Sequence, residues 1–226
     1  MLIRKYGITL KRLKEEDIEL VRQKRNSANI RNTMAYREEI TPEMQKKWFN
    51  SINNKYNGYF VIIHEGKKIG LINGKNIDFE KRTCEGGIFI WDEHYIKSVI
   101  PALASIMMND WTFLIINFNA IYAKVLTENK DALTYDKLMG YEPCEPLNEE
   151  KGVQWLVLRK ENYIHKINLI RKSLLPAFGD IEPLNPQDVD ASDDLGKEID
   201  QFYKGLSPDI QEKADELLNR ARKSQK

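Results

Sequence analysis

The stretch VLTENKDALTYDKLMGY, residues 125–141, carries several structural signals in close succession. An apolar strand pattern ends at Leu126, and residues 131–139 have the spacing of a helix. Gly140 follows at the position after the helix, where the backbone adopts the left-handed conformation that glycine tolerates. The stretch therefore predicts a strand, a turn and a helix in sequence.

Working outward from this stretch, strand and helix patterns alternate along the first 160 residues. The expected strands are 8–13, 59–63, 68–72, 87–91, 121–126 and 153–158, and the expected helices are 15–25, 42–52, 98–113 and 131–139. Glu65-Gly66 between two strand patterns indicates a hairpin. The order predicts an α/β domain with a mixed sheet over residues 1–160.

The remaining residues differ in composition from this domain. Residues 161–178 have helical spacing and are expected to form a helical extension. Residues 179–200 hold eight acidic residues, two prolines and one lysine, which predicts an acidic linker. Residues 201–226 predict an amphipathic C-terminal helix, with Ser207 as N-cap before Pro208. Its apolar stripe is expected to dock on its own core or to form a homodimer, ahead of binding a dedicated partner.

The overall composition excludes several classes of protein. The chain has 226 residues with 35 basic and 34 acidic side chains, and its formal charge is +1. No apolar run approaches the roughly 20 residues of a membrane span, and no charge excess favours nucleic acid. Two separated cysteines and three scattered histidines argue against a metal site or a disulfide framework. The N-terminus lacks the apolar segment of a secretion signal, so the expected compartment is the cytoplasm.

A family resemblance rests on the opening stretch together with the element order. Residues 125–141, through Asn129, Ala132, Tyr135, Gly140 and Tyr141, resemble the strand-Asn-helix-Gly-aromatic signature of the GNAT acetyltransferases. The resemblance covers roughly residues 5–160. It implies a mixed, mostly antiparallel central sheet flanked by helices, here with a helical C-terminal extension. It also implies acetyl transfer from acetyl-CoA, as co-substrate, to an amine.

The first 60 residues resemble one branch of that family. The pattern includes Arg25-Asn26, Ile30-Arg31, Met34, Glu39-Ile40-Thr41 and Gln45-Lys46-Lys47-Trp48-Phe49. It is similar to enzymes that acetylate amino sugars on nucleotide carriers, including the acetyltransferase of pseudaminic-acid synthesis. Ribosomal-protein alanine acetyltransferases share much of the same pattern.

The resemblance implies roles for several residues in the chemistry. Tyr135, one helical turn after Asn129 and Ala132, would protonate the departing thiolate, since an ordinary tyrosine has a higher pKa than a thiol. Asn129 would bind the pantetheine arm. Glu85 would relay the proton of the amine, and the alternative bases are Asp92, Glu93 and His94.

The resemblance also places the co-substrate along one strand and the loop that follows it. The backbone of Ile90 and Trp91 would pair with pantetheine and polarise the thioester carbonyl. Family members usually have glycines in the next loop, where backbone N–H groups cradle the pyrophosphate. Residues 94–102 contain none, so Ile96, Lys97 and Ser98 would have to supply that contact.

Acceptor binding is expected in the region between residues 25 and 48. The candidates are Arg25, Asn26, Arg31 and Trp48, with Met34 and Tyr36 nearby. Arginine forks suit phosphates and aromatic faces suit rings, whereas the ordinary alternatives are a solvated basic face and a core tryptophan.

The sequence leaves three functions open. The leading one is an N-acetyltransferase acting on a small amine, with a nucleotide-linked amino sugar as acceptor. The second acetylates protein N-termini or lysines. The third is a non-catalytic GNAT-like module that binds a partner through its C-terminal tail. A closed aromatic pocket would favour the sugar, and an open groove would favour a peptide.

Overall fold

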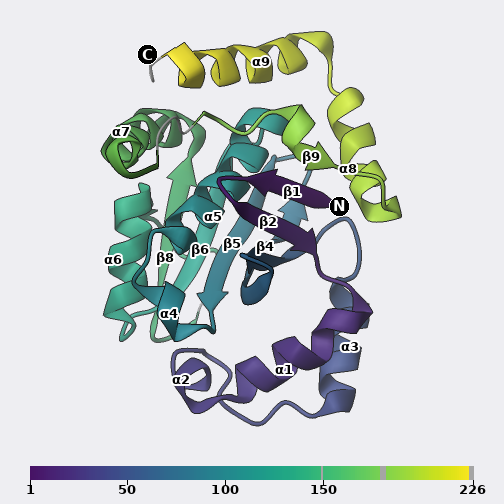
Figure 1. Cartoon of the computed structure of the whole chain (residues 1–226), viewed down its shortest axis with the longest axis vertical. Helices are drawn as coiled ribbons and strands as arrows, with labels where there is room; N and C mark the ends of the chain where they lie inside the picture. The colour runs from purple at the N-terminus through teal and green to yellow at the C-terminus, as the bar shows by residue number, and fades with distance from the viewer. Residues whose placement is uncertain (149, 179–181, 224–226) are drawn as a thin grey trace.

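One mixed sheet organises the chain. The computed structural model describes residues 1–148, 150–178 and 182–223. Within them, the strands form a single sheet in the order β7-β8-β6-β5-β4-β3-β2-β1-β9 (Figure 1). Neighbouring strands are antiparallel except for β5 and β6, which are parallel. A parallel pair in an otherwise antiparallel sheet requires a crossover, and helices α4 and α5 provide it.

The bounds of the elements agree closely with the sequence patterns in the first 160 residues. The strands are β1 (Leu2–Lys5), β2 (Ile8–Arg12), β3 (Gly58–His64), β4 (Lys67–Asp78), β5 (Thr83–Ile90), β6 (Ala120–Leu126), β7 (Glu142–Pro143), β8 (Val153–Arg159) and β9 (Val189–Asp190). The helices are η1 (Glu15–Asp17), α1 (Ile18–Asn26), α2 (Ala28–Arg31), α3 (Pro42–Ile52), α4 (Glu93–Ile96), α5 (Ile100–Asp110), η2 (Trp111–Ile115), α6 (Lys130–Met139), α7 (Lys160–Phe178), η3 (Pro186–Asp188), α8 (Asp194–Lys204) and α9 (Pro208–Lys223).

Local chemistry accounts for several of these boundaries. Glu65 and Gly66 both have positive φ, at 48° and 74°, which matches the turn that joins tightly twisted strands. Thr41 caps α3 by accepting a hydrogen bond from the Met44 N–H at 3.3 Å. Gly140 ends α6 with φ 101°, as the sequence predicted.

The two faces of the sheet are covered by different helices. The larger apolar cluster joins one face to α5, η2 and the C-terminal helices, and α6 packs on the same face over β6 and β8. Helices α1 and α3 cover the other face at Val61, Leu71 and Trp91. Since neighbouring residues of a strand face opposite sides, β5 presents Cys84 to the first face and Phe89 to the second.

The acidic segment is packed rather than free, which corrects the linker prediction for residues 182–200. The start of that prediction, residues 179–181, lies outside the described residues. Strand β9 pairs with β1 at the sheet edge, and the Leu184 side chain is fully buried. The low apolar content is offset by hydrogen bonds, because the carboxylate of Asp110 accepts the Leu184 N–H at 2.9 Å.

The same carboxylate anchors the extension from inside the core. Asp110 is fully buried and forms an ion pair with Arg171 of α7. The Tyr163 hydroxyl donates to it as well. Breaking a buried ion pair costs about 3–5 kcal/mol, so this network ties α7 and the segment after it to α5.

The last helix docks on its own chain, as one alternative predicted. Ala214, Leu218 and Ala221 of α9 are buried, and the Asn117 side chain donates to the Ile210 carbonyl at 3.1 Å. Residues 224–226 of the predicted helix lie outside the described part. A homodimer through this helix stays a prediction, and such a dimer would have to use a face of α9 other than this stripe.

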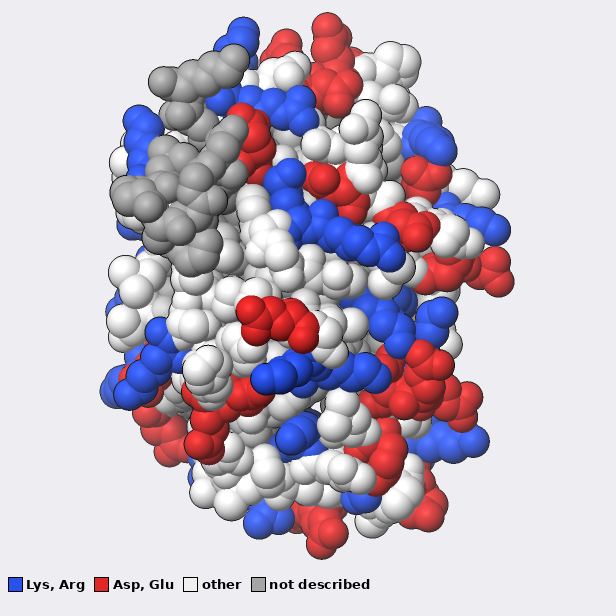
Figure 2. Space-filling view, viewed as in Figure 1, with Lys and Arg blue, Asp and Glu red and all other residues white. Residues whose placement is uncertain are grey.

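The surface shows no large area of one charge in the view of Figure 2, where basic and acidic side chains alternate over the described residues. This agrees with the near-neutral composition. No helix of the described residues is both long and apolar enough to cross a membrane.

Candidate active site

The site begins where the parallel strands β5 and β6 separate. They pair only at Thr83–Ala120, Cys84–Ile121 and Glu85–Tyr122. Beyond that point β5 continues to Ile90 and β6 to Leu126, each held by its other neighbour. We call this separation the splay, and Glu85–Gly86 its apex. Diverging strands leave backbone amides unpaired, which suits an extended ligand that itself carries amides.

The register of β5 determines which of its amides point into the splay. The Trp91 N–H donates to the Ile69 carbonyl at 3.0 Å, so that pair is hydrogen-bonded. Hydrogen-bonded pairs alternate along antiparallel strands, so Ile90, Ile88 and Gly86 point their N–H groups away from β4. Of the two predicted carbonyl-polarising residues, Ile90 therefore faces the splay, whereas the N–H of Trp91 is used within the sheet.

Glu85 lies at the apex on the face covered by α1 and α3. Its carboxylate accepts a hydrogen bond from the Asn76 side chain at 2.7 Å and pairs with Lys75 at 3.3 Å. Burial, with a smaller contribution from Glu85, raises the pKa of Tyr59 to about 12. Tyr59 in turn packs edge-to-face on Trp48, with ring centroids 5.2 Å apart. Glu85 and Trp48 thus belong to one side of the site.

The alternative bases are engaged in local structure. The Asp92 carboxylate caps α4 by accepting the His94 N–H at 3.1 Å. Glu93 accepts a hydrogen bond from Asn29, and the His94 ring lies edge-on to Tyr95. These residues stand at the far end of β5 from the apex.

Tyr135 points its hydroxyl from α6 into α5. It donates to the Pro101 carbonyl at 3.0 Å and lies 2.7 Å from the Ser105 hydroxyl. Burial raises its pKa above the ordinary value, so the phenol stays protonated. Its proton is already committed to a carbonyl between the two helices.

A second tyrosine lies on the same face, and the sequence analysis did not assign it a role. The Tyr141 hydroxyl lies 3.3 Å from the position that a Cβ on Gly86 would take. Burial, assisted by the charge of Asp136, raises the pKa of Tyr141 well above its usual value. Burial also raises the pKa of Asp136 to about 7.

Asn129 uses part of its side chain for local structure. Its amide oxygen caps α6 by accepting the Ala132 N–H at 3.1 Å. The side chain also lines a cavity of about 390 Å³ between the α2–α3 connection and the end of β6, formed by Asn32, Thr33, Leu126, Glu128, Asn129, Lys130 and Asp131. Asn129 thus stands at the open end of the splay.

The glycine-free loop, residues 94–102, forms hydrogen bonds to its own backbone groups. The Ser98 hydroxyl accepts the Ile100 N–H at 3.2 Å and donates to the Tyr95 carbonyl, and Pro101 has no N–H. Few donors at the first turn of α5 are therefore left for a pyrophosphate. Ile96 and Lys97 are exposed beside it, and Lys97 brings a positive charge. The unpaired backbone at the end of β5 thus suits the pantetheine of CoA. The loop suits the pyrophosphate only through the positive charge of Lys97.

Some of the predicted acceptor residues hold the local structure together, whereas others have side-chain atoms without a hydrogen-bond partner. Asn26 clamps the α2–α3 connection, because its side chain exchanges two hydrogen bonds of 2.9 Å with the backbone of Ile40. The Arg25 guanidinium lies over the Phe89 ring of β5, 5.9 Å from its centroid. Its Nη1 atom is buried, with no hydrogen-bond partner among the described residues. Arg31 is half-buried.

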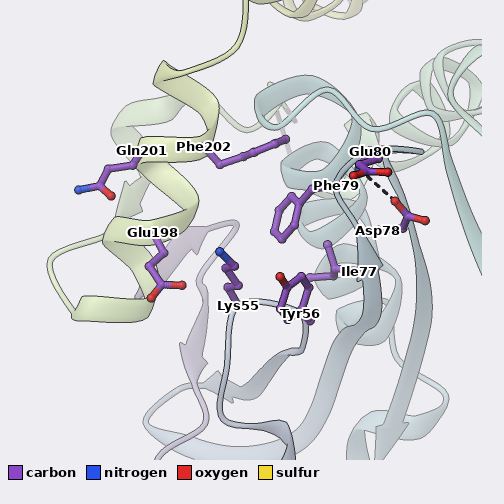
Figure 3. A pocket seen from close by; sticks show the side chains of 9 residues that line it. All are labelled: Lys55, Tyr56, Ile77, Asp78, Phe79, Glu80, Glu198, Gln201 and Phe202. Atoms are coloured by element: carbon purple, nitrogen blue, oxygen red, sulfur yellow. Dashed lines mark hydrogen bonds between the residues drawn. The ribbon is translucent and has the colours of Figure 1, made fainter.

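A larger cavity lies elsewhere in the molecule. It measures about 580 Å³ and lies between α8 and the loop between β4 and β5, with Phe202 reaching from α8 toward Phe79 (Figure 3). Asp78 and Phe79 line it at the start of the β4–β5 loop, on the far side of the strand pairing from the splay. It is separate from the candidate site. Within the described residues, no group of ligands suited to a metal ion is found.

Comparison with known proteins defines the class. The acetyltransferase (GNAT) domain family matches residues 8–137, and the chain therefore belongs to this family. The spermidine N(1)-acetyltransferase of Escherichia coli K12 is 26% identical over 137 residues, covering 60% of this chain and 73% of that protein.

Solved structures show the same fold. Spermidine N-acetyltransferase from Vibrio cholerae, in complex with CoA and spermine, aligns with a TM-score of 0.60 at 24% identity, covering 71% of this chain and 99% of that one. A domain from Methanocaldococcus jannaschii also gives 0.60, at 16% identity, covering 67% and 97%.

These findings confirm the fold class and the enzyme class. The protein is an N-acetyltransferase, and acetyl-CoA is its co-substrate. The predicted branch is not supported by the two named enzymes, since those of Escherichia coli and Vibrio cholerae are spermidine acetyltransferases. Asn26, part of the N-terminal pattern that suggested the branch, has a structural role, since its side chain is hydrogen-bonded to the backbone of Ile40.

Proposed function

We propose that this enzyme acetylates an aliphatic polyamine. The observation that carries the proposal is the placement of carboxylates at both ends of one face of the splay. Glu85 stands at the apex, opposite Tyr122 of β6, while Glu128 and Asp131 line the cavity just beyond Leu126. Leu126 is four positions after Tyr122 along β6, a rise of roughly 13 Å. An extended molecule with more than one amine matches this spacing, and the relatives named above support it.

In this proposal Glu85 acts as the base. The amine reaches the thioester from the face covered by α1 and α3, and Glu85 accepts its proton directly or through water. The N–H of Ile88 points into the splay two residues from Gly86 and polarises the thioester carbonyl, whereas the N–H of Ile90, farther from the apex, binds a pantetheine carbonyl. Asn129 and Lys97 bind the pantetheine and pyrophosphate ends of the co-substrate. Glu128 holds a second ammonium, in competition with its present ion pair to Arg37.

A second candidate acceptor is the nucleotide-linked amino sugar, favoured by Arg25. An unpaired, buried guanidinium nitrogen beside the acceptor face suits a phosphate or carboxylate and repels a polycation. The two candidate acceptors therefore predict opposite effects of Arg25→Met on activity. Methionine removes the charge of Arg25 but keeps an apolar chain that packs on Phe89.

The test is release of free CoA thiol with three acceptors: spermidine, a nucleotide-linked amino sugar, and a short peptide with a free N-terminus. We expect kcat/KM to be highest for spermidine, to fall about tenfold in Glu128→Gln, and to be unchanged or higher in Arg25→Met. Preference for the sugar, lost in Arg25→Met, would establish the second candidate. Preference for the peptide would reject both.

A further inference from the structure

The departing thiolate of CoA needs a proton, and the residue predicted to give it has its hydroxyl elsewhere. The Tyr135 hydroxyl is bonded to α5 through Pro101 and Ser105. To reach the splay it would have to give up both contacts. The other protonated groups on this face of the sheet therefore decide how the leaving group is handled.

Tyr141 is placed where its hydroxyl can reach a thiolate in the splay. The turn at Gly140 brings the chain back under the sheet, and the Tyr141 N–H donates to the Asp136 carbonyl at 2.9 Å. The Tyr141 hydroxyl then lies beside Gly86, the first residue of β5 after its pairing with β6 ends. A Cβ on Gly86 would meet the Tyr141 oxygen at 3.3 Å and Ile121 Cγ2 at 2.8 Å. Gly86 is therefore what lets the phenol approach the apex.

The hydroxyl of Tyr141 is also free to act. Among the described residues it makes no hydrogen bond, in contrast to Tyr135. It stands on the face of β5 opposite Glu85, because neighbouring residues of a strand point to opposite sides. A proton acceptor and a proton donor thus flank the apex from the two faces of the sheet.

We propose that Tyr141 is the residue that protonates the CoA thiolate. This rests on the proposed transferase reaction. The amine nitrogen attacks the thioester carbon, the new C–N bond forms, and the C–S bond breaks with its electron pair going to sulfur. Sulfur takes the phenolic proton of Tyr141, the amine proton passes to Glu85, and solvent returns a proton to the phenolate.

The first experiment compares two matched variants, Tyr141→Phe and Tyr135→Phe. We expect kcat of Tyr141→Phe to fall about 100-fold with little change in KM, and that of Tyr135→Phe to change less than threefold. The deficit of Tyr141→Phe should shrink above pH 9, where a free thiol is ionised and needs no proton. Full activity in Tyr141→Phe, or a deficit that is the same at every pH, would overturn the proposal.

The second experiment needs no acceptor and separates this proposal from the proposed function. Calorimetric titration compares CoA with desulfo-CoA, which lacks the sulfur. Tyr141→Phe should weaken binding of CoA severalfold and leave desulfo-CoA unchanged. Equal effects on both ligands, or no effect on either, would overturn the role of Tyr141. Wild-type protein that binds neither ligand would instead overturn the proposed function.

Discussion

The two ends of strand β5 are built in different ways. At the apex, Glu85 and Gly86 hold polar groups of opposite role on the two faces of the sheet, with little side-chain volume between them. At the other end, the loop after Trp91 is filled by side chains and caps its own helices through Asp92 and Ser98. In the proposed reaction, the end where the thioester would react is thus open, whereas the loop where the pyrophosphate would bind already has its backbone N–H groups hydrogen-bonded within the chain.

Under the proposed mechanism, this difference means that the chemistry and the affinity of one co-substrate depend on separate regions. Backbone geometry provides the reaction site, since the splay and the alternation of β5 need no particular motif. The pyrophosphate contact depends on free N–H groups, which Ser98 and Pro101 have removed from the first turn of α5. Changes at the apex should therefore alter kcat, and changes in the loop should alter KM.

The largest expected effect is at the apex. Glu85→Gln keeps the hydrogen bond from Asn76 but cannot accept the amine proton, so kcat should fall by about 10² to 10³ at pH 7. The measurement is steady-state release of CoA thiol over a range of pH. The deficit should decrease at high pH, where the amine is already neutral. A change confined to KM would assign Glu85 to acceptor binding.

An intermediate effect is expected at the loop. Lys97→Ala removes the exposed positive charge beside the first turn of α5, so KM for acetyl-CoA should rise about five- to tenfold with kcat unchanged. Lys172→Ala, an exposed lysine of α7 outside the site, is the control of equal charge. The effect of Lys97→Ala should diminish in high salt. A drop in kcat instead would show that the two ends of β5 are not independent.

The smallest expected effect concerns stability. The pKa of Asp136 is raised to about 7, so folding favours its protonated form. This contribution is complete below the unfolded pKa near 4 and is lost as pH rises through 7. Asp136→Asn should therefore be more stable than the wild type above pH 7, by about 1 to 2 kcal/mol after solvent screening. Denaturant unfolding at pH 5 and pH 8 measures this, and an identical difference at both pH values would contradict it.

The candidate site could be predicted in part from local patterns. The strand-turn-helix stretch located Asn129 and the opening, because a cap, a helix period and a glycine act within a few residues. The same stretch could not show which of Tyr135 and Tyr141 faces the splay, since that depends on how α6 rotates against α5 and on the turn after Gly140. The sequence shows a glycine at position 86, but sequence patterns alone do not show that this glycine makes room for the hydroxyl of Tyr141.

The acidic segment shows the same limit. Its composition predicted a linker because it contains few large apolar residues, and that inference counts only side-chain burial. The structure orders residues 182–200 through other interactions: strand pairing of β9 with β1, a buried Leu184, and the carboxylate of Asp110 from a distant helix. None of these partners is a neighbour in the chain.

The sequence by itself determined the element order, the mixed sheet and the membership of the transferase family, because periodicity, caps and turns are local properties of the chain. The tertiary structure alone decided that β5 and β6 separate after three residue pairs, that Glu85 and Tyr141 flank the apex, and that the C-terminal segment closes the sheet edge. These features depend on strand register and on side chains far apart in the sequence, which no local pattern specifies.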